Sequence, residues 1–181
     1  RIECYDISNL QGTDAVGSMI VFEEGRPAKS QYRRYRIRHV DGQDDFAMMG
    51  EVIRRRLARA TGENPDPRFG RLPDLIVVDG GKGQLNSAGA AVDAMAQSAG
   101  LPRVPVVSLA ERNEEIFLRG ESAPLMLPRE SKSLRLMQHM RDEAHRFAVA
   151  YHRALRGKKG IASELDQVPG IGKKRLVALM K

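Results

Sequence analysis

The sequence places a carboxylate and a glycine-rich turn directly after an apolar run, a combination that can bind a metal ion or a phosphate. The run is 75–78, and Asp79 follows it, ahead of Gly80-Gly81-Lys82-Gly83. A short apolar run rich in β-branched residues is typical of a strand buried on both faces of a sheet. Ligands of open α/β sheets bind at the carboxyl ends of such strands. A plain strand-to-helix turn, with Asp79 as the helix N-cap, is the structural alternative.

Asp6 is the second candidate for this chemistry. It lies in Ile2–Ser8, where apolar and polar residues alternate as they do in a strand. If this strand neighbours the strand at 75–78, Asp6 and Asp79 project from strands about 4.8 Å apart. Two carboxylates that close repel each other unless a cation lies between them. Oxygen ligands suit Mg²⁺ or Mn²⁺ better than zinc, so we expect a site for one of these two ions.

His145 is the third candidate, in a strongly charged run at 141–147. A helix advances about 100° per residue, so His145 lies about 60° from Ala148 and borders the apolar stripe of a predicted helix. It can therefore face the sheet without being buried in the core. A histidine in such a place is more often structural. The acids and bases around it favour a functional site, because charges near a buried face are costly unless they are paired or used.

The hydrophobic pattern predicts three strands joined by short turns, followed by alternating helices and strands. The expected strands cover 2–8, 16–23, 29–40, 75–78 and 104–109, with a hairpin at 115–118 and 124–127, and the expected helices cover 46–60, 84–98 and 131–156. This is the element order of a ribonuclease-H-like (RNase-H-like) α/β fold, a mixed sheet of three antiparallel strands and two parallel additions flanked by helices. Its first and fourth strands are neighbours, which brings Asp6 and Asp79 together.

The composition favours a polyanionic partner. The formal net charge is +7, from 30 Lys and Arg against 23 Asp and Glu, and nucleic acid is the commonest polyanion. Aromatic residues make up 5% and Trp is absent, which favours contacts with the nucleic-acid backbone over base stacking. Cys4 is the single cysteine, so no disulfide can form within the chain and a reducing cytoplasm fits. No apolar run reaches the ~18–20 residues that span a membrane, so we expect no membrane contact.

The last part of the chain has the pattern of a helix-hairpin-helix element. Gly170 and Gly172 bracket a tight hairpin, and the N–H groups of the next helix would meet a phosphate beside Lys173, Lys174 and Arg175. A dinucleotide-binding loop fits less well, because Arg175 replaces its third glycine and no strand precedes it. We therefore expect an RNase-H-like domain over 1–156, a basic linker at 157–163 and the hairpin element over 164–181.

Other basic residues are candidates for contacts with DNA phosphates. Lys82 and Arg146 lie next to the candidate site residues in the sequence. Arg129 and Lys132 would extend the track, although plain solvated surface explains these two equally well. The basic run at 54–56 follows a helix, so its three arginines cannot all face DNA.

Four motifs in chain order carry a family resemblance: Ile2-Glu3-Cys4-Tyr5-Asp6-Ile7-Ser8-Asn9, Asp44-Asp45-Phe46-Ala47-Met48-Met49, Asp79-Gly80-Gly81-Lys82-Gly83-Gln84-Leu85 and Arg141-Asp142-Glu143-Ala144-His145-Arg146-Phe147. Together they resemble the C-terminal endonuclease half of UvrC, the incision subunit of the bacterial UvrABC nucleotide-excision-repair nuclease. The resemblance covers essentially the whole chain. It includes the first of the two helix-hairpin-helix elements that follow in the family, so we expect this chain to be a fragment of a longer protein.

The resemblance implies an RNase-H-like fold with an Asp-Asp-His metal site that cuts the damaged DNA strand on the 5′ side of the lesion. Carried over to the matching positions, the catalytic and metal-binding set is Asp6, Asp79 and His145. Asp45 matches a further acid that the family needs for this incision, and we interpret it as a supporting or helix-capping group. The implied partners are damaged double-stranded DNA and UvrB, whose docking segment would lie upstream of Arg1.

Two other classes of function stay open. A nucleic-acid-binding module could keep the fold and catalyse nothing. Another RNase-H-like nuclease, such as a junction resolvase or an enzyme that acts on RNA, would use the same acids. The sequence excludes a P-loop nucleotide hydrolase at 80–84, since no G-x-x-x-x-G-K-[ST] pattern is present there.

Overall fold

One mixed sheet organises the computed structural model, which describes residues 1–8, 15–40, 42, 44–61, 66, 69–111 and 113–166, the stretch 155–166 by its backbone only. Its strands and helices are β1 Ile2–Ser8, β2 Val16–Glu23, β3 Arg26–Pro27, the 3-10 turn η1 Lys29–Gln31, β4 Arg33–Arg36, α1 Asp45–Ala58, β5 Leu75–Asp79, α2 Lys82–Ala99, β6 Val106–Ala110, β7 Glu115–Leu118 and α3 Lys132–Asp166. The strand order is β3-β2-β1-β5-β6-β7, and β4 also pairs with β2.

The pairing of the strands confirms the predicted fold class. β1 pairs with β2 in antiparallel orientation and with β5 in parallel orientation, and β5 continues the parallel part through β6. The first and fourth strands of the predicted order, β1 and β5, are therefore neighbours. The edge strand β7 returns antiparallel to β6.

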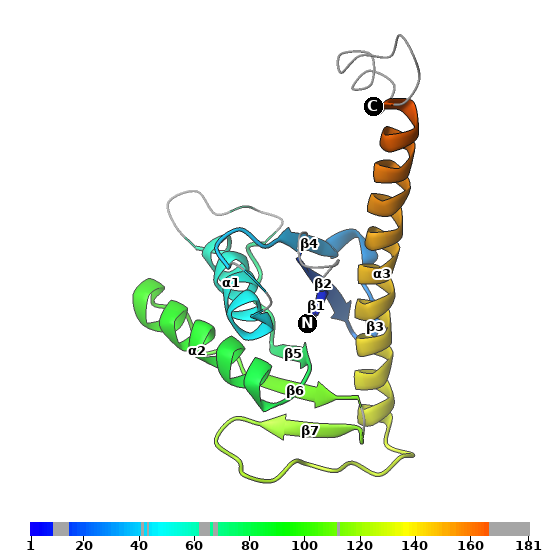
Figure 1. Ribbon diagram of the computed structural model, residues 1–181. Coiled ribbons are helices and arrows are strands. Elements are labelled where there is room, and N and C mark those ends of the chain that lie inside the picture. The colour runs from blue at the N-terminus through cyan, green and yellow to red at the C-terminus, as the bar shows by residue number, and fades with distance from the viewer. Residues whose placement is uncertain are drawn as a thin grey trace.

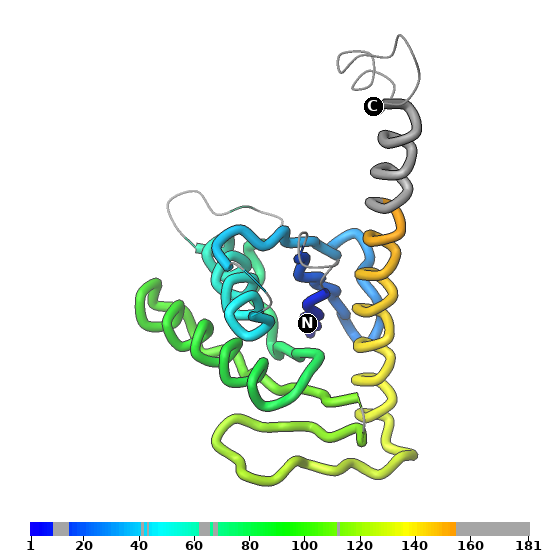
Figure 2. The backbone as a smooth tube through the Cα atoms, in the orientation of Figure 1, coloured from blue at the N-terminus to red at the C-terminus, as the bar shows by residue number. Residues whose placement is uncertain are grey.

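Helices cover the sheet on both faces (Figures 1 and 2). α1 and α2 pack on one face, where their apolar side chains share a core cluster with Tyr5. α3 packs on the opposite face, where Ala144 joins a cluster with Cys4 and Val77. Because side chains alternate along a strand, Cys4 and Asp6 face α3 while Tyr5 faces the other two helices.

The predicted strand at 29–40 is wrong in its extent. The chain forms the short strand β3, then the 3-10 turn η1, and then β4, which pairs with β2. In the turn, the N–H groups of Gln31 and Tyr32 donate to the carbonyl oxygens of Ala28 and Lys29, so they are not available to a strand ladder. The second strand of the predicted hairpin is reduced to a single bridge between Ile116 and Leu125, since prolines at 124 and 128 limit pairing on either side.

α3 is longer than predicted, because it continues without a break to Asp166. The expected basic linker at 157–163 therefore lies inside the helix. Its two glycines each cost a helix only about 1 kcal/mol, and the next helix-breaking residue is Pro169. Most of the predicted helix-hairpin-helix, with Gly170 and Gly172, lies outside the described residues, and the division into domains stays a prediction.

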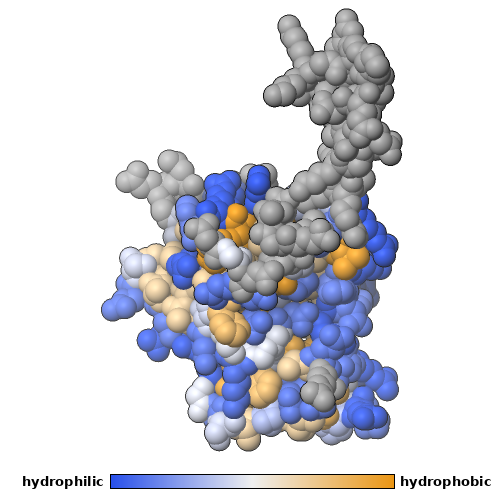
Figure 3. Space-filling view, viewed as in Figure 1, coloured by the Kyte–Doolittle hydropathy of each residue, from blue (hydrophilic) through white to orange (hydrophobic). Residues whose placement is uncertain are grey.

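The face of the molecule seen in Figure 3 is mostly polar. Hydrophilic residues dominate the face shown in Figure 3, with small apolar patches among them. None of the helices in the described part of the chain combines the length and apolar content needed to cross a membrane.

A buried ion pair ties α1 to β1 on the face away from α3. Arg56 and Glu3 are both fully buried, and Arg56 Nη2 donates to Glu3 Oε1 over 2.8 Å. Arg56 also donates to the carbonyl oxygens of Phe69 (3.0 Å) and Arg71 (2.7 Å). The sequence run at 54–56 is thus not a uniform basic face, because one of its three arginines stabilises the interior.

Replacing Arg56 should destabilise the fold. Arg56→Ala leaves Glu3 buried with less compensation, and breaking a buried pair typically costs about 3–5 kcal/mol. Arg54 is exposed two positions earlier on α1, so Arg54→Ala is the matched control and should change the free energy of unfolding by less than about 0.5 kcal/mol. Urea denaturation measures both. Equal stability of the two variants would contradict the structural role of Arg56.

Candidate active site

The register of β1 against β5 brings two carboxylates together. The parallel pairing matches Cys4 with Val77 and Tyr5 with Val78, and Asp6 and Asp79 are the next residues of the two strands. Cys4 and Val77 belong to the cluster under α3. The alternation along each strand turns Asp6 and Asp79 toward the same α3 side of the sheet.

Asp79 is the last residue of β5 and does not cap the following helix. The N-cap of α2 is Gly81, whose N–H donates to Gln84 Oε1 over 3.2 Å. Gly80 has φ +141°, a backbone conformation that other residues rarely adopt. The N-cap alternative for Asp79 is therefore wrong, and the glycines turn the chain so that the carboxylate stays at the end of the strand.

His145 reaches the same place from α3. Its Nδ1 lies 3.9 Å from Asp6 Oδ2, and its side chain is 69% exposed. The predicted position of His145 beside the buried stripe is confirmed, since Ala144 and Ala148 are buried and His145 is not. The ring is close enough to Asp6 to interact electrostatically and open enough to meet a substrate.

Burial and mutual repulsion perturb both carboxyls. Burial, and after it the charge of Asp6, raises the pKa of Asp79 to about 7, while Arg141 and His145 act in the opposite direction. Burial also raises the pKa of Asp6, which His145 lowers and Asp45 raises. Two neighbouring acids with raised pKa values are typical of sites that bind a cation or transfer protons.

One oxygen of the pair receives no hydrogen bond from the residues that the structure describes. Asp6 Oδ2 is buried and accepts no hydrogen bond, although a buried carboxylate oxygen normally does. A divalent cation would satisfy it, so the donor set fits Mg²⁺ or Mn²⁺. Among the side chains that the structure describes, no three His, Cys, Asp or Glu residues are grouped closely enough to hold an ion by themselves. Asp6 and Asp79 are thus an anionic pair without a complete protein shell.

A cleft of about 540 Å³ opens beside Asp79. Its lining residues are Asp79, Glu111, Arg141, Asp142, His145, Arg146, Val149, Ala150 and Arg153. The sequence analysis missed Glu111, Arg141 and Arg153. A signal existed for two of them: Glu111 follows β6, the next parallel strand after β5, and Arg141 lies one helical turn before His145.

The charges around His145 are largely paired with each other. Arg141 bonds to Glu114 over 2.9 Å and to Asp142 over 3.0 Å. Arg146 pairs with Glu143, which also accepts a hydrogen bond from the Tyr32 hydroxyl. The charge density at 141–146 therefore does not by itself indicate a function, because ion pairs within the chain account for much of it.

The comparisons with known proteins agree with this geometry. A family model described as "UvrC RNAse H endonuclease domain" matches residues 1–149. The chain belongs to this UvrC family. Proteins named "UvrABC system protein C" from Dehalococcoides mccartyi, Moorella thermoacetica and Porphyromonas gingivalis are 51%, 49% and 47% identical to the whole chain. The chain spans 28–29% of the length of these relatives.

In this UvrC chain, Asp45 lies near the acids but is not the helix cap. Asp44 is the N-cap of α1, and its Oδ1 accepts from the N–H of Ala47 over 2.9 Å. Asp45 is the first residue of the helix, and its charge raises the pKa of Asp6. The helix-capping interpretation of Asp45 is wrong, and a supporting electrostatic role remains.

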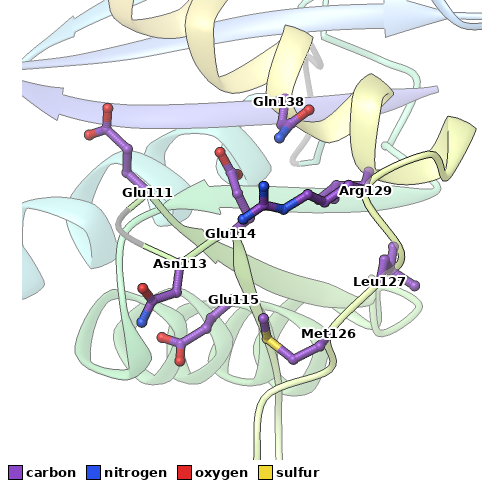
Figure 4. Close-up of a pocket in the computed structure, with 9 residues that line it drawn as sticks. Glu111, Asn113, Glu114, Glu115, Met126, Leu127, Arg129 and Gln138 are labelled. Carbon is purple, nitrogen blue, oxygen red and sulfur yellow. The ribbon is translucent and has the colours of Figure 1, made fainter.

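The predicted phosphate contacts are spread over the UvrC domain. Arg146 lines the cleft, but Lys82 does not, since its Nζ donates to the carbonyl oxygen of Ser122 over 2.6 Å. Arg129 lines a second cavity with Glu111 and Glu114 (Figure 4), and Lys132 is exposed at the start of α3. Lys173, Lys174 and Arg175 lie outside the described residues.

The raised pKa of Asp79 predicts how stability depends on pH in the UvrC domain without divalent ions. Between pH ~4 and about 7 the folded chain keeps a proton that the unfolded chain has lost, so this residue's contribution to stability falls as the pH rises through that window. Asp79→Asn should therefore stabilise the fold at pH 8, by on the order of 2 kcal/mol, and have little effect below pH 4.

Asp93→Asn is the control, because the pKa of Asp93 is shifted in the opposite direction. The stability of both variants is measured by thermal unfolding over the same pH series in EDTA. Arg119 lowers the pKa of Asp93 by a hydrogen bond, so this variant should gain no stability at pH 8. An Asp79→Asn variant less stable than the wild type at pH 8 would contradict the raised pKa.

Proposed function

We propose that this chain is a divalent-metal-dependent DNA endonuclease that makes the 5′ incision on the damaged strand in bacterial nucleotide excision repair. The observation that carries the proposal is the pair Asp6 and Asp79 at the ends of neighbouring strands, with a histidine 3.9 Å from a buried Asp6 oxygen that accepts no hydrogen bond from the described residues. Family membership supports the reaction class, phosphodiester hydrolysis.

Mg²⁺ or Mn²⁺ would be held by Asp6 and Asp79, with His145 completing or adjoining the shell. When bound, such an ion lowers the pKa of water and stabilises the charge that develops on the phosphate and the leaving oxygen. Mg²⁺ commonly keeps several waters and uses one or two carboxylates plus substrate phosphates. A pair of acids without a third fixed ligand suits this mode of binding.

The role that we propose for each residue of the chain follows from its position. Asp6 and Asp79 place two acids at the ends of neighbouring strands, where they would hold the cation that in turn attracts the scissile phosphate. The exposed ring of His145 can hold or move a proton beside that phosphate. Asp45 adds negative charge near Asp6 and so strengthens the attraction for a cation.

Basic residues around the cleft would bind the DNA backbone. Arg141, Arg146 and Arg153 line it next to Asp79, and a net charge of +7 favours a polyanion. Arg141 and Arg146 are already paired with acids of the chain, so a phosphate would compete with those pairs. Arg153 is exposed and is the cleft arginine that we expect to contribute most to binding.

The wider setting is proposed from the relatives. They are named "UvrABC system protein C", and we propose that damaged double-stranded DNA and UvrB are the partners of this chain, in the bacterial cytoplasm. A nucleic-acid-binding module without catalysis is the second candidate. The lack of three grouped ligand side chains in the described residues favours it, and the next experiment separates the two.

Removing any member of the Asp-Asp-His set should abolish the 5′ incision and keep the fold. Asp6→Ala, Asp79→Ala and His145→Ala are introduced into a UvrC protein that carries this chain, and a lesion-bearing duplex labelled at one end is incubated with UvrA, UvrB and Mg²⁺. We expect a loss of at least about 10³-fold for each variant, as for the loss of a principal catalytic group.

We propose, as the resemblance to UvrC implies, that a module upstream of this chain makes the 3′ incision, so 3′ cutting is the internal control and should continue. EDTA should stop 5′ cutting, and Mn²⁺ should restore it. Wild-type levels of 5′ cutting by any of the three variants would refute the site, and cutting in EDTA would refute the metal requirement.

The predicted hairpin element should contribute to DNA affinity and not to the chemistry. Lys173→Ala combined with Lys174→Ala should weaken binding to a fluorescent duplex and lower the slope of log affinity against log salt by about 2, since two phosphate contacts are lost. Cutting at saturating DNA should be unchanged. An unaltered salt slope would show that these lysines do not touch phosphate.

A further inference from the structure

Two histidines of α3 face the same strand. His145 and His152 are seven residues apart on α3, and seven residues advance a helix by about 700°, close to two full turns. The two rings therefore lie on nearly the same side of the helix. Both of them contact β1, whose residues carry one of the proposed metal ligands.

The two histidines contact residues on the same face of β1. His145 Nδ1 lies 3.9 Å from Asp6 Oδ2, and His152 Nε2 lies 2.7 Å from Ser8 Oγ. Asp6 and Ser8 are two residues apart, so their side chains leave the same face of β1. The His145 side chain is 69% exposed, whereas His152 is buried at 7%. Only the first histidine is open to a substrate, and the second joins the strand to the helix.

Ser8 is linked to two other elements through its hydroxyl. Its Oγ shares a hydrogen bond with His152 Nε2 over 2.7 Å and lies 3.4 Å from the Val16 carbonyl oxygen, to which the hydroxyl can donate. These contacts join three elements at one point, because Ser8 ends β1, Val16 begins β2 and His152 belongs to α3.

The end of β1 is held by fewer strand pairings than its beginning. The ladder with β5 pairs residues of β1 up to Tyr5, whereas the ladder with β2 continues to Ser8. Beyond Tyr5, therefore, the backbone that carries Asp6 is held by strand pairing on the β2 side. Asp6 Oδ2 accepts no hydrogen bond that could fix the carboxylate on its own. The place of this carboxylate thus depends on where the end of β1 lies relative to α3.

We propose that the Ser8–His152 hydrogen bond is a positioning contact that sets the spacing between Asp6 and His145. By fixing the end of β1 against α3, it holds the two groups at the separation that a divalent ion or a scissile phosphate requires. Its effects on cutting and on ion affinity rest on the proposed function, while its effect on the distance between Asp6 and His145 does not. His152 touches neither the ion nor the DNA in this proposal.

The test uses the full chain and Mn²⁺ as the probe. Ser8→Ala and His152→Leu remove the bond, whereas Ser8→Thr and His152→Gln keep a hydroxyl and an N–H donor at the same places. We expect the first two to weaken Mn²⁺ affinity, measured by electron paramagnetic resonance, by about 10–100-fold, the usual loss when a group that orients a ligand is removed. The second two should restore it to within a few-fold.

Tyr32→Phe is the matched control. Its hydroxyl donates to Glu143 on α3 over 3.2 Å in a buried setting, so the variant also loses a contact to α3, but one away from the end of β1. It should lower the melting temperature without changing Mn²⁺ affinity. In the cutting assay, run well below the melting temperature of each variant so that all of the protein is folded, Ser8→Ala should lower kcat, whereas Tyr32→Phe should not.

A crystal structure of metal-free Ser8→Ala completes the test, and the expected result is a longer distance between Asp6 and His145 than in the metal-free wild type. An unchanged distance with unchanged Mn²⁺ affinity would overturn the positioning role. If the wild type binds Mn²⁺ but cuts no DNA, the proposed function fails and the positioning contact is judged on geometry and affinity alone.

Discussion

The parallel pairing of β1 with β5 is the constraint on which the site depends. It places Asp6 and Asp79 at matching positions of neighbouring strands, although 73 residues separate them in the sequence. A slip of one residue in this register would turn one carboxylate to the opposite face of the sheet and into the core under α1 and α2. The buried residues that flank the pair, Tyr5 and Val78 on one face and Cys4 and Val77 on the other, fix the register because they fill two separate cores.

α3 contributes the histidine and the arginines that lie beside this pair of acids. Its buried side chains, among them Met140 and Ala144, pack on the sheet, and this packing sets which residues of the helix reach the end of β1. His145 follows the buried Ala144 directly and is exposed. The histidine is therefore placed by the apolar face of the helix and not by polar contacts of its own. The same packing brings Arg146 and Arg153 to the rim of the cleft.

The features that the sequence predicted well are those that local patterns determine. The apolar run before Asp79 predicts a buried strand, and the helical spacing around His145 predicts which side of the helix the histidine lies on. The order of the elements then predicts which strands are neighbours. The parts that were missed depend on tertiary contacts. The burial of Arg56 is one example. Three consecutive arginines look alike in the sequence, so the sequence does not show which of them will bond to Glu3 and to two carbonyl oxygens. The extent of α3 is another example. The segment 157–163, which contains Gly157 and Gly160, was predicted as a linker, but α3 continues through it.

Two charged residues of β1 show how a structural charge differs from a functional one. Glu3 faces α1, is fully buried, and is neutralised by Arg56 and Arg1 while it accepts a further bond from the Tyr5 hydroxyl. Asp6, three residues later and on the other face, has one buried oxygen without a hydrogen bond and a histidine 3.9 Å away. Both acids pay the cost of desolvation, but only the first is compensated within the chain. Asp6, with Asp79 as a second acid beside it and His145 3.9 Å away, is therefore the acid whose charge the proposed cation would compensate.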